Sequence, residues 1–335
     1  MLSQSSVERG LIVGLGSIGQ RHLRNIMQMY GDIELLVHRH QENKDLDIQG
    51  IKYITNDLDE ALDLEPDFAI ICNPSPFHID TAIEIAHRGV HLLIEKPISS
   101  STQRVEELIA LSKEKKIKLM VGYNLRFLES LNFFKQSVQD EIVGEIFSIK
   151  ADVGQNLKYW RQNQDYTKGV TANKNLGGGA LLELSHEFDY ISWIFGPVDW
   201  VSGLIGKKSN LRINVEDFSI STLGFKDKNY VANINMDLFR HDTVRECTVI
   251  GEKGTIKWNA LENSVMIFSK SDKSWKTIFN EPIDKDSSYR KEMKHFIDCI
   301  LQDEEPLING YSALSVLEII EAIRSSSRDG RVVSI

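Results

Sequence analysis

The chain has little cysteine and no long hydrophobic run. Its three cysteines, Cys72, Cys247 and Cys299, are odd in number and far apart, so the pattern predicts neither a disulfide framework nor a zinc cluster, and no metal site is expected. No apolar stretch approaches the roughly 20 residues of a membrane-spanning helix, and the first residues lack the apolar core of a signal peptide. These absences predict a cytoplasmic protein with reduced thiols and no membrane partner.

An excess of basic charge is also absent. The 335 residues include 39 lysines and arginines against 48 aspartates and glutamates, a net charge of −9. A nucleic-acid-binding surface usually shows as a basic face or stripe, so no nucleic-acid partner is expected, although single Lys and Arg side chains can still hold small anions. With 41% hydrophobic and 26% charged residues the composition is that of a globular protein, and the length favours two domains.

A glycine-rich turn, Gly14-Leu15-Gly16-Ser17-Ile18-Gly19, follows the apolar run 11–13 and opens an amphipathic segment. In dinucleotide-binding units the first glycine permits the tight turn, the second lets the backbone approach the pyrophosphate, and the third lets the helix pack on the strand. The phosphates then bind free N–H groups at the helix N-terminus. The order of strand, glycine turn and helix therefore predicts a dinucleotide site at Gly14, Gly16, Ser17, Ile18 and Gly19.

Residues 1–123 repeat a strand-helix rhythm typical of a Rossmann domain, a doubly wound parallel sheet. The apolar runs are continuous rather than alternating, which suits strands covered on both faces. Such sheets bind ligands at the carboxyl ends of their strands. Strands are predicted at 11–13, 33–37, 53–54, 68–72, 90–94 and 119–122, and helices at 58–62, 77–88 and 102–115.

The end of the second strand decides which dinucleotide binds, because an acidic residue there hydrogen-bonds to the adenosine ribose. The strand ends in Val37-His38-Arg39-His40, and the nearby acids Asp32 and Glu34 lie at its other end. A guanidinium at Arg39 suits a 2′-phosphate, so NAD(P) binding beside His38 and Arg39 is predicted with NADP favoured. If these residues are only a solvated charge cluster, NAD is the cofactor instead.

Two further loops follow strand ends on the same edge of the predicted sheet. Asn73, Pro74 and His78 belong either to a stiff loop against which a nicotinamide ribose lies or to an ordinary strand-to-helix turn. Glu95-Lys96-Pro97 places a charged pair at the end of an apolar strand, where Lys96 would project toward the ligand. Glu95 and Lys96 are therefore added to the predicted cofactor site.

Together, Gly14-x-Gly16-x-x-Gly19, the Asn73-Pro74 loop that ends at His78, and Glu95-Lys96-Pro97 resemble, in order and spacing, the Gfo/Idh/MocA family of NAD(P)-dependent oxidoreductases. The resemblance covers the whole chain, and its most specific part is the Glu-Lys-Pro motif. It implies that Lys96 is catalytic and that a cis peptide bond precedes Pro97. It also implies a homodimer or homotetramer that pairs through the C-terminal sheet.

Residues 124–335 are predicted to form a substrate-binding and oligomerisation domain of the α+β class. Turn signals separate its strand-like segments, which indicates a large, mostly antiparallel sheet that is open on one face. Strands are predicted at 146–153, 200–204, 218–225, 230–238, 246–250, 255–258 and 264–268, and helices at 130–138, 180–196, 290–301 and 313–325.

The helix predicted at 180–196 follows a run of three glycines and carries the second set of catalytic candidates. Its apolar residues keep helical spacing, which places Glu183, His186 and Glu187 together on another face. A carboxylate beside an imidazole fixes its orientation, as proton transfer requires. The alternative is a surface ion pair on an amphipathic helix.

The resembled family has a glycine run here, then an acid, a histidine four residues later and another acid three later. His186 and Asp189 match this motif from its C-terminal side, but the chain is one residue short between the glycines and His186. The resemblance therefore supports His186 as the catalytic histidine. Its partner carboxylate is either Glu183 or Glu187.

An aromatic and polar segment ahead of the glycines suits a sugar ring, through Tyr159 and Trp160, although Trp160 packed into the core is the alternative. Arg126, Lys158 or Arg161 would bind a phosphate or carboxylate of the substrate. The predicted substrate site also includes Lys96 and His186, with Glu216, Asp217, Arg240 and His241 as weaker candidates. The other residues of the predicted substrate site are Asn124, Arg126, Tyr159, Trp160 and Arg161.

These residues predict an oxidoreductase that transfers hydride between nicotinamide and a secondary alcohol or ketone of a sugar, as a sugar phosphate or nucleotide sugar. His186 would exchange the hydroxyl proton while Lys96 donates hydrogen bonds to the same oxygen, or their roles are reversed. Two alternatives remain: a reductase of a dihydrodiol or tetrapyrrole, and a cofactor-binding regulator without turnover. Both Lys96 and His186 are present, which argues against the regulator.

Overall fold

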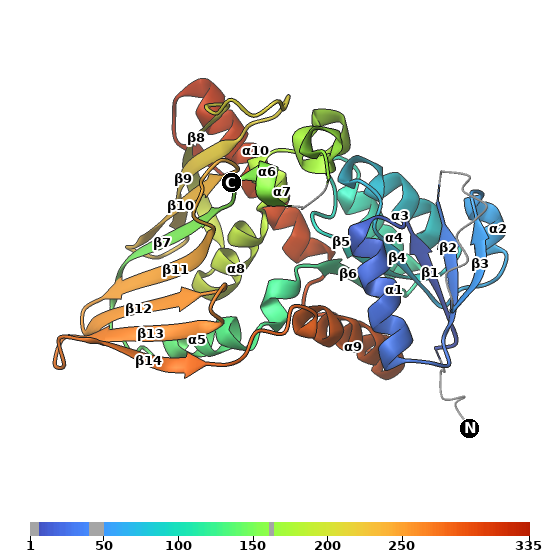
Figure 1. Ribbon diagram of the computed structural model, residues 1–335, viewed down its shortest axis with the longest axis horizontal. Coiled ribbons are helices and arrows are strands. Elements are labelled where there is room, and N and C mark those ends of the chain that lie inside the picture. The colour runs from blue at the N-terminus through green and yellow to red at the C-terminus, as the bar shows by residue number, and fades with distance from the viewer. Residues whose placement is uncertain (1–6, 40–49, 161–163) are drawn as a thin grey trace. The chain divides into compact units, whose positions relative to one another are not determined.

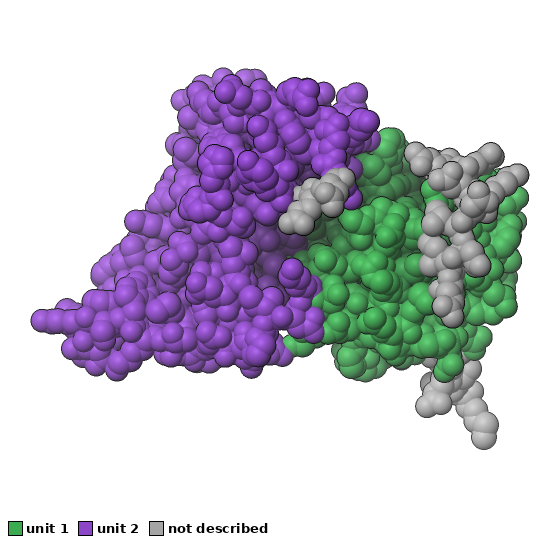
Figure 2. All heavy atoms as spheres, in the orientation of Figure 1, with its two compact units in different colours: residues 1–124, 286–315 green, residues 125–285, 316–335 purple. Residues whose placement is uncertain are grey.

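The computed structural model describes residues 7–39, 50–160 and 164–335, and the chain divides into two compact units (Figure 2). Unit 1 comprises residues 1–124 and 286–315, and unit 2 comprises 125–285 and 316–335. Segment 286–315, which was predicted to belong to the second domain, thus packs with the first. One reason is visible in the core, where Phe296 packs edge-on against Phe68 with ring centroids 6.0 Å apart.

Unit 1 is built on a parallel six-stranded sheet in the order β3-β2-β1-β4-β5-β6, which confirms the Rossmann prediction (Figure 1). The apolar side chains of β1, β4 and β5 are completely or almost completely buried, as expected of strands covered on both faces. The strand order reverses between β1 and β4, where such sheets bind their ligands. The strands are β1 Arg9–Val13, β2 Glu34–His38, β3 Ile51–Thr55, β4 Phe68–Ile71, β5 His91–Glu95 and β6 Leu119–Gly122.

Helices cover this sheet (Figure 1). Helix α1 contacts α9, a helix from the C-terminal part of the chain, and α3 contacts α4. The α1–α9 pair brings two distant sequence segments together beside the glycine-rich turn. The helical elements are α1 Ser17–Met29, α2 Leu58–Leu62, the 3₁₀ turn Ser75–Phe77, α3 His78–His87, α4 Val105–Glu114, the 3₁₀ turn Asn124–Phe127 and α9 Ser287–Gln302.

Unit 2 contains a nine-stranded sheet in the order β14-β13-β12-β11-β7-β10-β9-β8-β15. Neighbouring strands are antiparallel except β7 and β10, so the mostly antiparallel sheet is confirmed. Strands β14 and β15 were not predicted; they are edge strands whose side chains are exposed or half-buried, so burial imposes no alternating pattern on their sequences. The strands are β7 Ile146–Gly154, β8 Val198–Gly206, β9 Phe218–Phe225, β10 Val231–Asp237, β11 Val244–Gly251, β12 Gly254–Asn259, β13 Ser264–Ser269, β14 Trp275–Asn280 and β15 Val333–Ser334.

One face of this sheet is buried by helices. Helix α5 packs on β12–β14 and α7 packs on β9 and β10. Trp258 of β12 is completely buried, lies edge-on to Tyr190, and donates a hydrogen bond from Nε1 to Ser130 Oγ at 3.0 Å. The helical elements are α5 Glu129–Gln139, α6 Leu157–Trp160, the 3₁₀ turns Tyr166–Lys168, Val170–Ala172 and Lys174–Leu176, α7 Ala180–Glu183, α8 His186–Phe195 and α10 Gly310–Asp329.

The other face of the sheet carries exposed apolar side chains. Leu204 of β8 and Ile220 of β9 are cross-strand neighbours, and they are 55% and 54% exposed. Within the described ranges, no helix has the length and apolar character needed to cross a membrane.

Candidate functional site

The glycine-rich turn joins β1 to α1 at the point where the strand order reverses. Gly14 has a φ of +92°, and a Cβ there would lie 2.8 Å from the Asn73 backbone nitrogen. Its own N–H donates to the His38 carbonyl at 2.9 Å. A Cβ on Gly19 would lie only 2.1 Å from the Gly14 oxygen, so a side chain at either position would force the backbone apart.

Gly16 differs from its two neighbours in the motif, because a Cβ built on it meets no atom within 4 Å. It precedes α1, which begins without a side-chain cap and without an acidic residue in its first turn. Ser17 is exposed and Ile18 is half-buried in that turn. Open space in front of free N–H groups at a helix N-terminus fits an anionic phosphate, so these residues suit a dinucleotide.

The end of β2 holds the residues predicted to read the adenosine ribose. His38 is buried, with 5% of its surface exposed, and its carbonyl accepts the Gly14 N–H. Arg39 follows it and is half-buried, and its backbone N–H donates to the Thr55 carbonyl at 3.0 Å. Glu34 lies at the start of β2 and pairs with Arg9 at 3.0 Å. His40 lies outside the described residues.

His78 connects the two other loops at this edge of the sheet. Its Nδ1 lies 2.9 Å from the Pro97 carbonyl and its Nε2 lies 2.7 Å from the Asn73 carbonyl. The ring is 1% exposed, and this burial lowers its pKa, although the two carbonyls oppose the shift. His78 thus joins the two loops, and its predicted contact with the cofactor stays a prediction.

The two loops that His78 joins contain Asn73 and Pro74 on one side and Lys96 and Pro97 on the other. Asn73 donates from Nδ2 to Thr81 Oγ1 at 3.2 Å, while its buried Oδ1 has no hydrogen-bond partner among the residues that the structure describes. Pro74 directly precedes the 3₁₀ turn Ser75–Phe77, which leads to His78. The Lys96-Pro97 peptide bond is cis, as the family resemblance implies. Lys96 is half-buried directly after β5.

Glu95 and Asn124, which were predicted in the ligand sites, form hydrogen bonds with other residues of unit 1. Glu95 Oε1 lies 2.7 Å from His22 Nε2, and Glu95 Oε2 accepts the Lys96 N–H at 3.2 Å. Asn124 is buried and donates from Nδ2 to Ser288 Oγ at 2.8 Å. These hydrogen bonds tie both side chains into unit 1, and the contacts of Glu95 with the cofactor and of Asn124 with the substrate stay predictions.

The helix predicted at 180–196 is broken. Helix α7 ends at Glu183, Leu184 has φ −101° and ψ 25°, and α8 begins at His186. The prediction of one continuous helix with Glu183, His186 and Glu187 on a single face is therefore wrong. The break lies where the sequence is one residue short of the motif in the resembled family.

The two candidate carboxylates have different surroundings. Glu183 accepts a hydrogen bond from Thr171 Oγ1 at 3.1 Å and is half-buried. Glu187 is completely buried, and its Oε1 lies 2.9 Å from Arg245 Nε on β11. His186, 7% exposed, begins α8. Because Glu187 is neutralised by an arginine, Glu183 is the better candidate to orient the His186 ring.

Arg126 was predicted to bind an anionic part of the substrate, and the structure gives its charge another partner. Its Nε and Nη2 lie 2.9 and 2.7 Å from the two carboxylate oxygens of Asp189, a bidentate pair with side chains 6% and 0% exposed. Its guanidinium also lies 5.2 Å from the Trp193 ring centroid. Burial raises the pKa of Asp189 and Arg126 opposes that shift. Arg126 is thus part of the core of unit 2.

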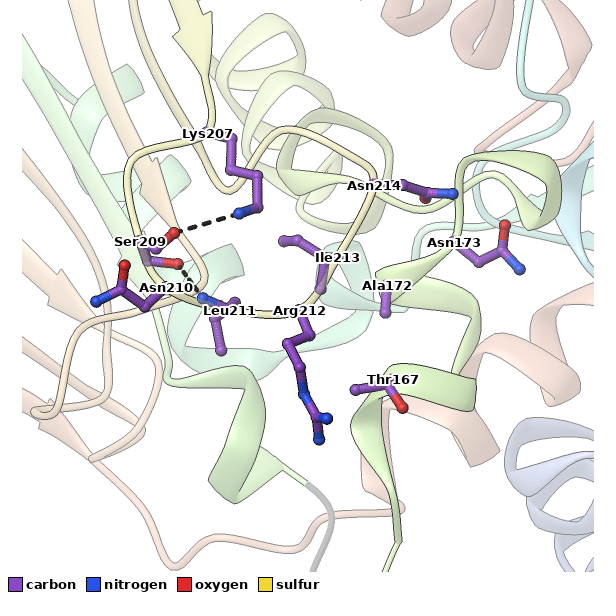
Figure 3. Close-up of a pocket in the computed structure, with 10 residues that line it drawn as sticks. All are labelled: Thr167, Ala172, Asn173, Lys207, Ser209, Asn210, Leu211, Arg212, Ile213 and Asn214. Atoms are coloured by element: carbon purple, nitrogen blue, oxygen red, sulfur yellow. Dashed lines mark hydrogen bonds between the residues drawn. The ribbon is translucent and has the colours of Figure 1, made fainter.

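A polar cavity of about 570 Å³ lies between the loop that follows β8 and the segment that precedes the glycine run (Figure 3). Arg212 and Lys207 bring positive charge to it. We call it the Arg212 pocket. It is lined by Thr167, Ala172, Asn173, Lys207, Ser209, Asn210, Leu211, Arg212, Ile213 and Asn214.

The loop that carries these cations is held by a buried carboxylate. Asp217 accepts the N–H groups of Lys208 and Ser209 at 2.8 and 2.9 Å and the Ser209 hydroxyl at 2.6 Å. The Arg212 N–H donates to Tyr166 Oη at 3.2 Å, which joins the loop to the opposite wall. Asp217 was among the weaker candidates for the substrate site, but the loop that carries Lys207 and Arg212 was not predicted. The sequence signal of this loop is a run of basic and amide residues between two strands.

The pocket wall is continuous with the segment that leads to the candidate catalytic helix. The Ala172 carbonyl accepts the Asn214 N–H at 3.3 Å, and the Thr171 carbonyl accepts the Gly179 N–H at 3.1 Å. The aromatic candidates lie farther back along the same segment. Tyr159 is 64% exposed, Trp160 is half-buried at the end of α6, and Arg161 lies outside the described residues.

The weaker candidates are accounted for by local contacts. Glu216 accepts the Leu181 N–H at 3.2 Å, and burial raises its pKa. Arg240 pairs with the exposed Asp242 at 2.9 Å, and His241 beside it is exposed. In the described ranges, no group of three or more His, Cys, Asp or Glu side chains is placed to hold a metal ion.

Comparison with known proteins identifies both halves of the chain. Residues 9–123 match the model of an oxidoreductase family's NAD-binding Rossmann fold, and residues 135–335 match that family's C-terminal alpha/beta domain. The scyllo-inositol 2-dehydrogenase (NAD(+)) of Bacillus subtilis is 24% identical, with 98% of this chain and 96% of that protein aligned.

Two solved structures have the same fold over nearly their full length. Levoglucosan dehydrogenase in complex with NADH superposes with a TM-score of 0.87 at 17% identity and covers 98% of this chain and 99% of its own. The WlbA dehydrogenase of Bordetella pertussis in complex with NADH and UDP-GlcNAcA gives 0.82 at 23% identity, with 98% and 99% covered. With both family domains matched in order, the chain belongs to the Gfo/Idh/MocA family and is an oxidoreductase with an NAD-binding Rossmann domain.

Proposed function

We propose that this protein is an NAD(P)-dependent dehydrogenase or reductase that acts on a secondary alcohol or ketone of a sugar. The observation that carries the proposal is a chain of contacts at one edge of the unit 1 sheet. The glycine turn packs against Asn73 at Gly14, and His78 joins the Asn73 carbonyl to the Pro97 carbonyl. The loop that begins with Lys96 is therefore connected, through His78 and the Asn73 loop, to the turn that would hold the pyrophosphate.

Each catalytic candidate has a defined task in this proposal. Bound nicotinamide supplies the acceptor or donor of the hydride. Lys96 donates a hydrogen bond to the reacting oxygen of the substrate and stabilises the charge that develops on it. His186 takes up or returns the hydroxyl proton, and Glu183 orients its imidazole. The inositol and levoglucosan dehydrogenases among the similar proteins support a polyhydroxylated substrate.

We further propose that the substrate carries a phosphate or nucleotide group, which the Arg212 pocket binds. Guanidinium groups bind phosphate oxygens through paired hydrogen bonds, and a lysine adds a mobile positive charge. The cavity volume of about 570 Å³ is enough for part of a nucleotide. The WlbA dehydrogenase, whose complex holds UDP-GlcNAcA, supports an anionic sugar of this kind.

Replacing Arg212 or Lys207 with alanine is expected to raise the KM for an anionic sugar about tenfold or more, because each change removes charge-assisted hydrogen bonds. The kcat should change little, since the pocket binds a part of the substrate away from the reacting carbon. Steady-state kinetics across free sugars, sugar phosphates and nucleotide sugars measures this, with Lys226→Ala on an exposed turn as the charge-matched control.

Two outcomes would contradict different parts of the proposal. An equal loss with neutral and anionic sugars would show that the pocket does not read charge. Absence of turnover with every sugar, in both directions and with both cofactors, would overturn the dehydrogenase itself in favour of a non-sugar substrate or a regulator.

We propose that Arg39 gives the site a preference for NADP. Arg39→Ala is then expected to weaken NADPH binding about tenfold or more, because one bidentate contact with the 2′-phosphate is lost. NADH binding should stay unchanged and is the internal control. Titration followed by nicotinamide fluorescence measures both constants, and equal affinity of the unaltered protein for NADH and NADPH would remove this role.

We also propose that two copies pair through the open face of the unit 2 sheet. Leu204 and Ile220 lie opposite each other on neighbouring strands and are more than half exposed. Exposed apolar side chains grouped in this way are typical of a protein–protein interface. A homodimer or homotetramer follows. Sedimentation as a monomer at assay concentrations would contradict it.

A further inference from the structure

A buried group of titratable side chains lies in unit 1 where α1, β5 and α9 meet, and it was not predicted from the sequence. Glu95 at the end of β5 is only 8% exposed, His22 on α1 is 1% exposed, and Glu292 on α9 is completely buried. Polar residues on amphipathic helices usually face solvent, and His22 and Glu292 do not. Their sequence signal is position: His22 precedes Leu23 and Glu292 precedes Met293, both on the buried faces of their helices.

Glu95 uses both of its carboxylate oxygens to hold the loop that begins with Lys96. Oε1 lies 2.7 Å from His22 Nε2 and Oε2 accepts the Lys96 backbone N–H at 3.2 Å. Gly122 leaves room for this arrangement, because a Cβ there would lie 3.3 Å from Glu95 Oε2. The orientation of Glu95 therefore bears on where the Lys96 backbone lies.

Glu292 is the anomaly in this group. Both of its carboxylate oxygens are buried, and neither has a hydrogen-bond partner among the residues that the structure describes. An ionised carboxylate in such surroundings loses its hydration without compensation, so the neutral acid is favoured. Burial, and after it the neighbouring Glu95 carboxylate, raise the pKa of Glu292 well above its ordinary value.

The groups that face Glu292 come from each element around it. Burial is the largest cause that raises the pKa values of the Cys72 thiol and the Tyr289 hydroxyl, and the charges of Glu95 and Glu292 raise them further. The titratable and charged side chains of this cluster are Arg21 and His22 of α1, Cys72 after β4, Glu95 of β5, and Tyr289 of α9.

Helix α1 is connected to α9 at the same place. The Arg21 guanidinium lies 4.7 Å from the Tyr289 ring centroid and pairs with Asp286 at 3.0 Å. The His22 ring lies edge-on to Tyr289, with centroids 5.9 Å apart. Because α1 begins at the glycine turn, a disturbance between these helices reaches the proposed pyrophosphate site as well as the Lys96 loop.

We propose that Glu292 is a positioning residue that acts as the neutral acid: it lets Glu95 keep its pairing with His22 and its hydrogen bond to the Lys96 N–H. Loss of the Glu292 proton places two buried carboxylates beside each other. The repulsion displaces Glu95, loosens α1 from α9, and moves both the Lys96 loop and the glycine turn. Glu292 thereby sets an upper limit on the pH at which the Lys96 loop and the glycine turn keep their places. Only the effect on catalysis rests on the proposed function.

The sign of the effect on stability follows from the raised pKa. A carboxyl that titrates higher in the folded protein than in the unfolded chain contributes its full stability below the unfolded pKa, about 4.3 for glutamate. That contribution falls as the pH rises through the folded pKa. Glu292→Gln keeps the size of the side chain but cannot ionise, so its free energy of unfolding should not fall with pH for this reason.

Urea unfolding of the whole protein at several pH values tests this without any cofactor. The midpoints of Glu292→Gln and the unaltered protein should differ least at pH 4, below the unfolded pKa, and the Glu292→Gln midpoint should lie progressively higher as the pH is raised from 4 toward 9. Glu114→Gln, on the exposed face of α4, makes the same charge change and should shift no midpoint with pH. A constant difference between Glu292→Gln and the unaltered protein at every pH would overturn the proposal.

Cofactor binding supplies the second measurement. The NADH dissociation constant of the unaltered protein should rise severalfold between pH 7 and pH 9.5, while Glu292→Gln and Glu292→Met should bind NADH equally at both. Parallel pH profiles would show Glu292 to be merely structural and overturn its positioning role. If no variant binds NADH but the urea result holds, the failure belongs to the proposed function and the buried neutral acid stands.

Discussion

Replacing Lys96 with methionine is expected to lower kcat about 10²–10⁴-fold, the range for losing a positioned acid or an oxyanion donor. Methionine keeps much of the length of the lysine side chain and removes only its charge and hydrogen-bond donors. Because Lys96 is half-buried directly after β5 and its N–H is held by Glu95, the backbone of the loop should be undisturbed. The NADH dissociation constant measured by fluorescence should therefore change much less than kcat.

His186→Asn is the companion variant, because asparagine keeps a polar group but cannot accept a proton at neutral pH. If Lys96 and His186 act on one oxygen, the double variant should lose little beyond the more severe single variant, since residues that work as a unit are not additive. Full turnover in both single variants would exclude the mechanism. A loss that appears entirely in KM would instead make these residues substrate binders.

The Rossmann half was predictable because its strands are buried on both faces. Continuous apolar runs as short as 68–72 are typical of strands in a covered parallel sheet, and the glycine motif fixes the strand-to-helix order around them. The structure confirms the parallel sheet. Strand β14 could not be found in the same way, because its side chains are exposed or half-buried at the edge of the second sheet and burial left no pattern in its sequence.

The site was less predictable because partner choice depends on the tertiary fold. Leu181, Leu184 and Phe188 keep helical spacing across the break at Leu184, so periodicity alone cannot detect it. His78 was assigned to the cofactor because its loop follows a strand end, and Arg126 was assigned to the substrate because a guanidinium binds anions. The fold instead supplies His78 with two carbonyls and Arg126 with Asp189.

Arg126→Met is expected to cost about 3–5 kcal/mol of unfolding free energy, because it leaves the buried Asp189 without its counter-charge. Asp189 is 0% exposed and Arg126 is 6% exposed, so water cannot replace the lost pair. The loss should grow from pH 5 to pH 8. Burial already raises the pKa of Asp189, and the loss of Arg126 raises it further. At low pH Asp189 is therefore protonated and needs no counter-charge, whereas at higher pH it ionises without one.

Urea unfolding of the whole protein, followed by tryptophan fluorescence, measures this loss. Lys276→Met, which breaks the exposed pair with Asp272, should cost less than about 1 kcal/mol in the same assay. The double variant Arg126→Met with Asp189→Leu should recover most of the stability, because removing both charges also removes the unpaired one. If Arg126→Met left stability intact and raised only the KM for an anionic substrate, the arginine would bind substrate after all, and its pairing with Asp189 would have to open during binding.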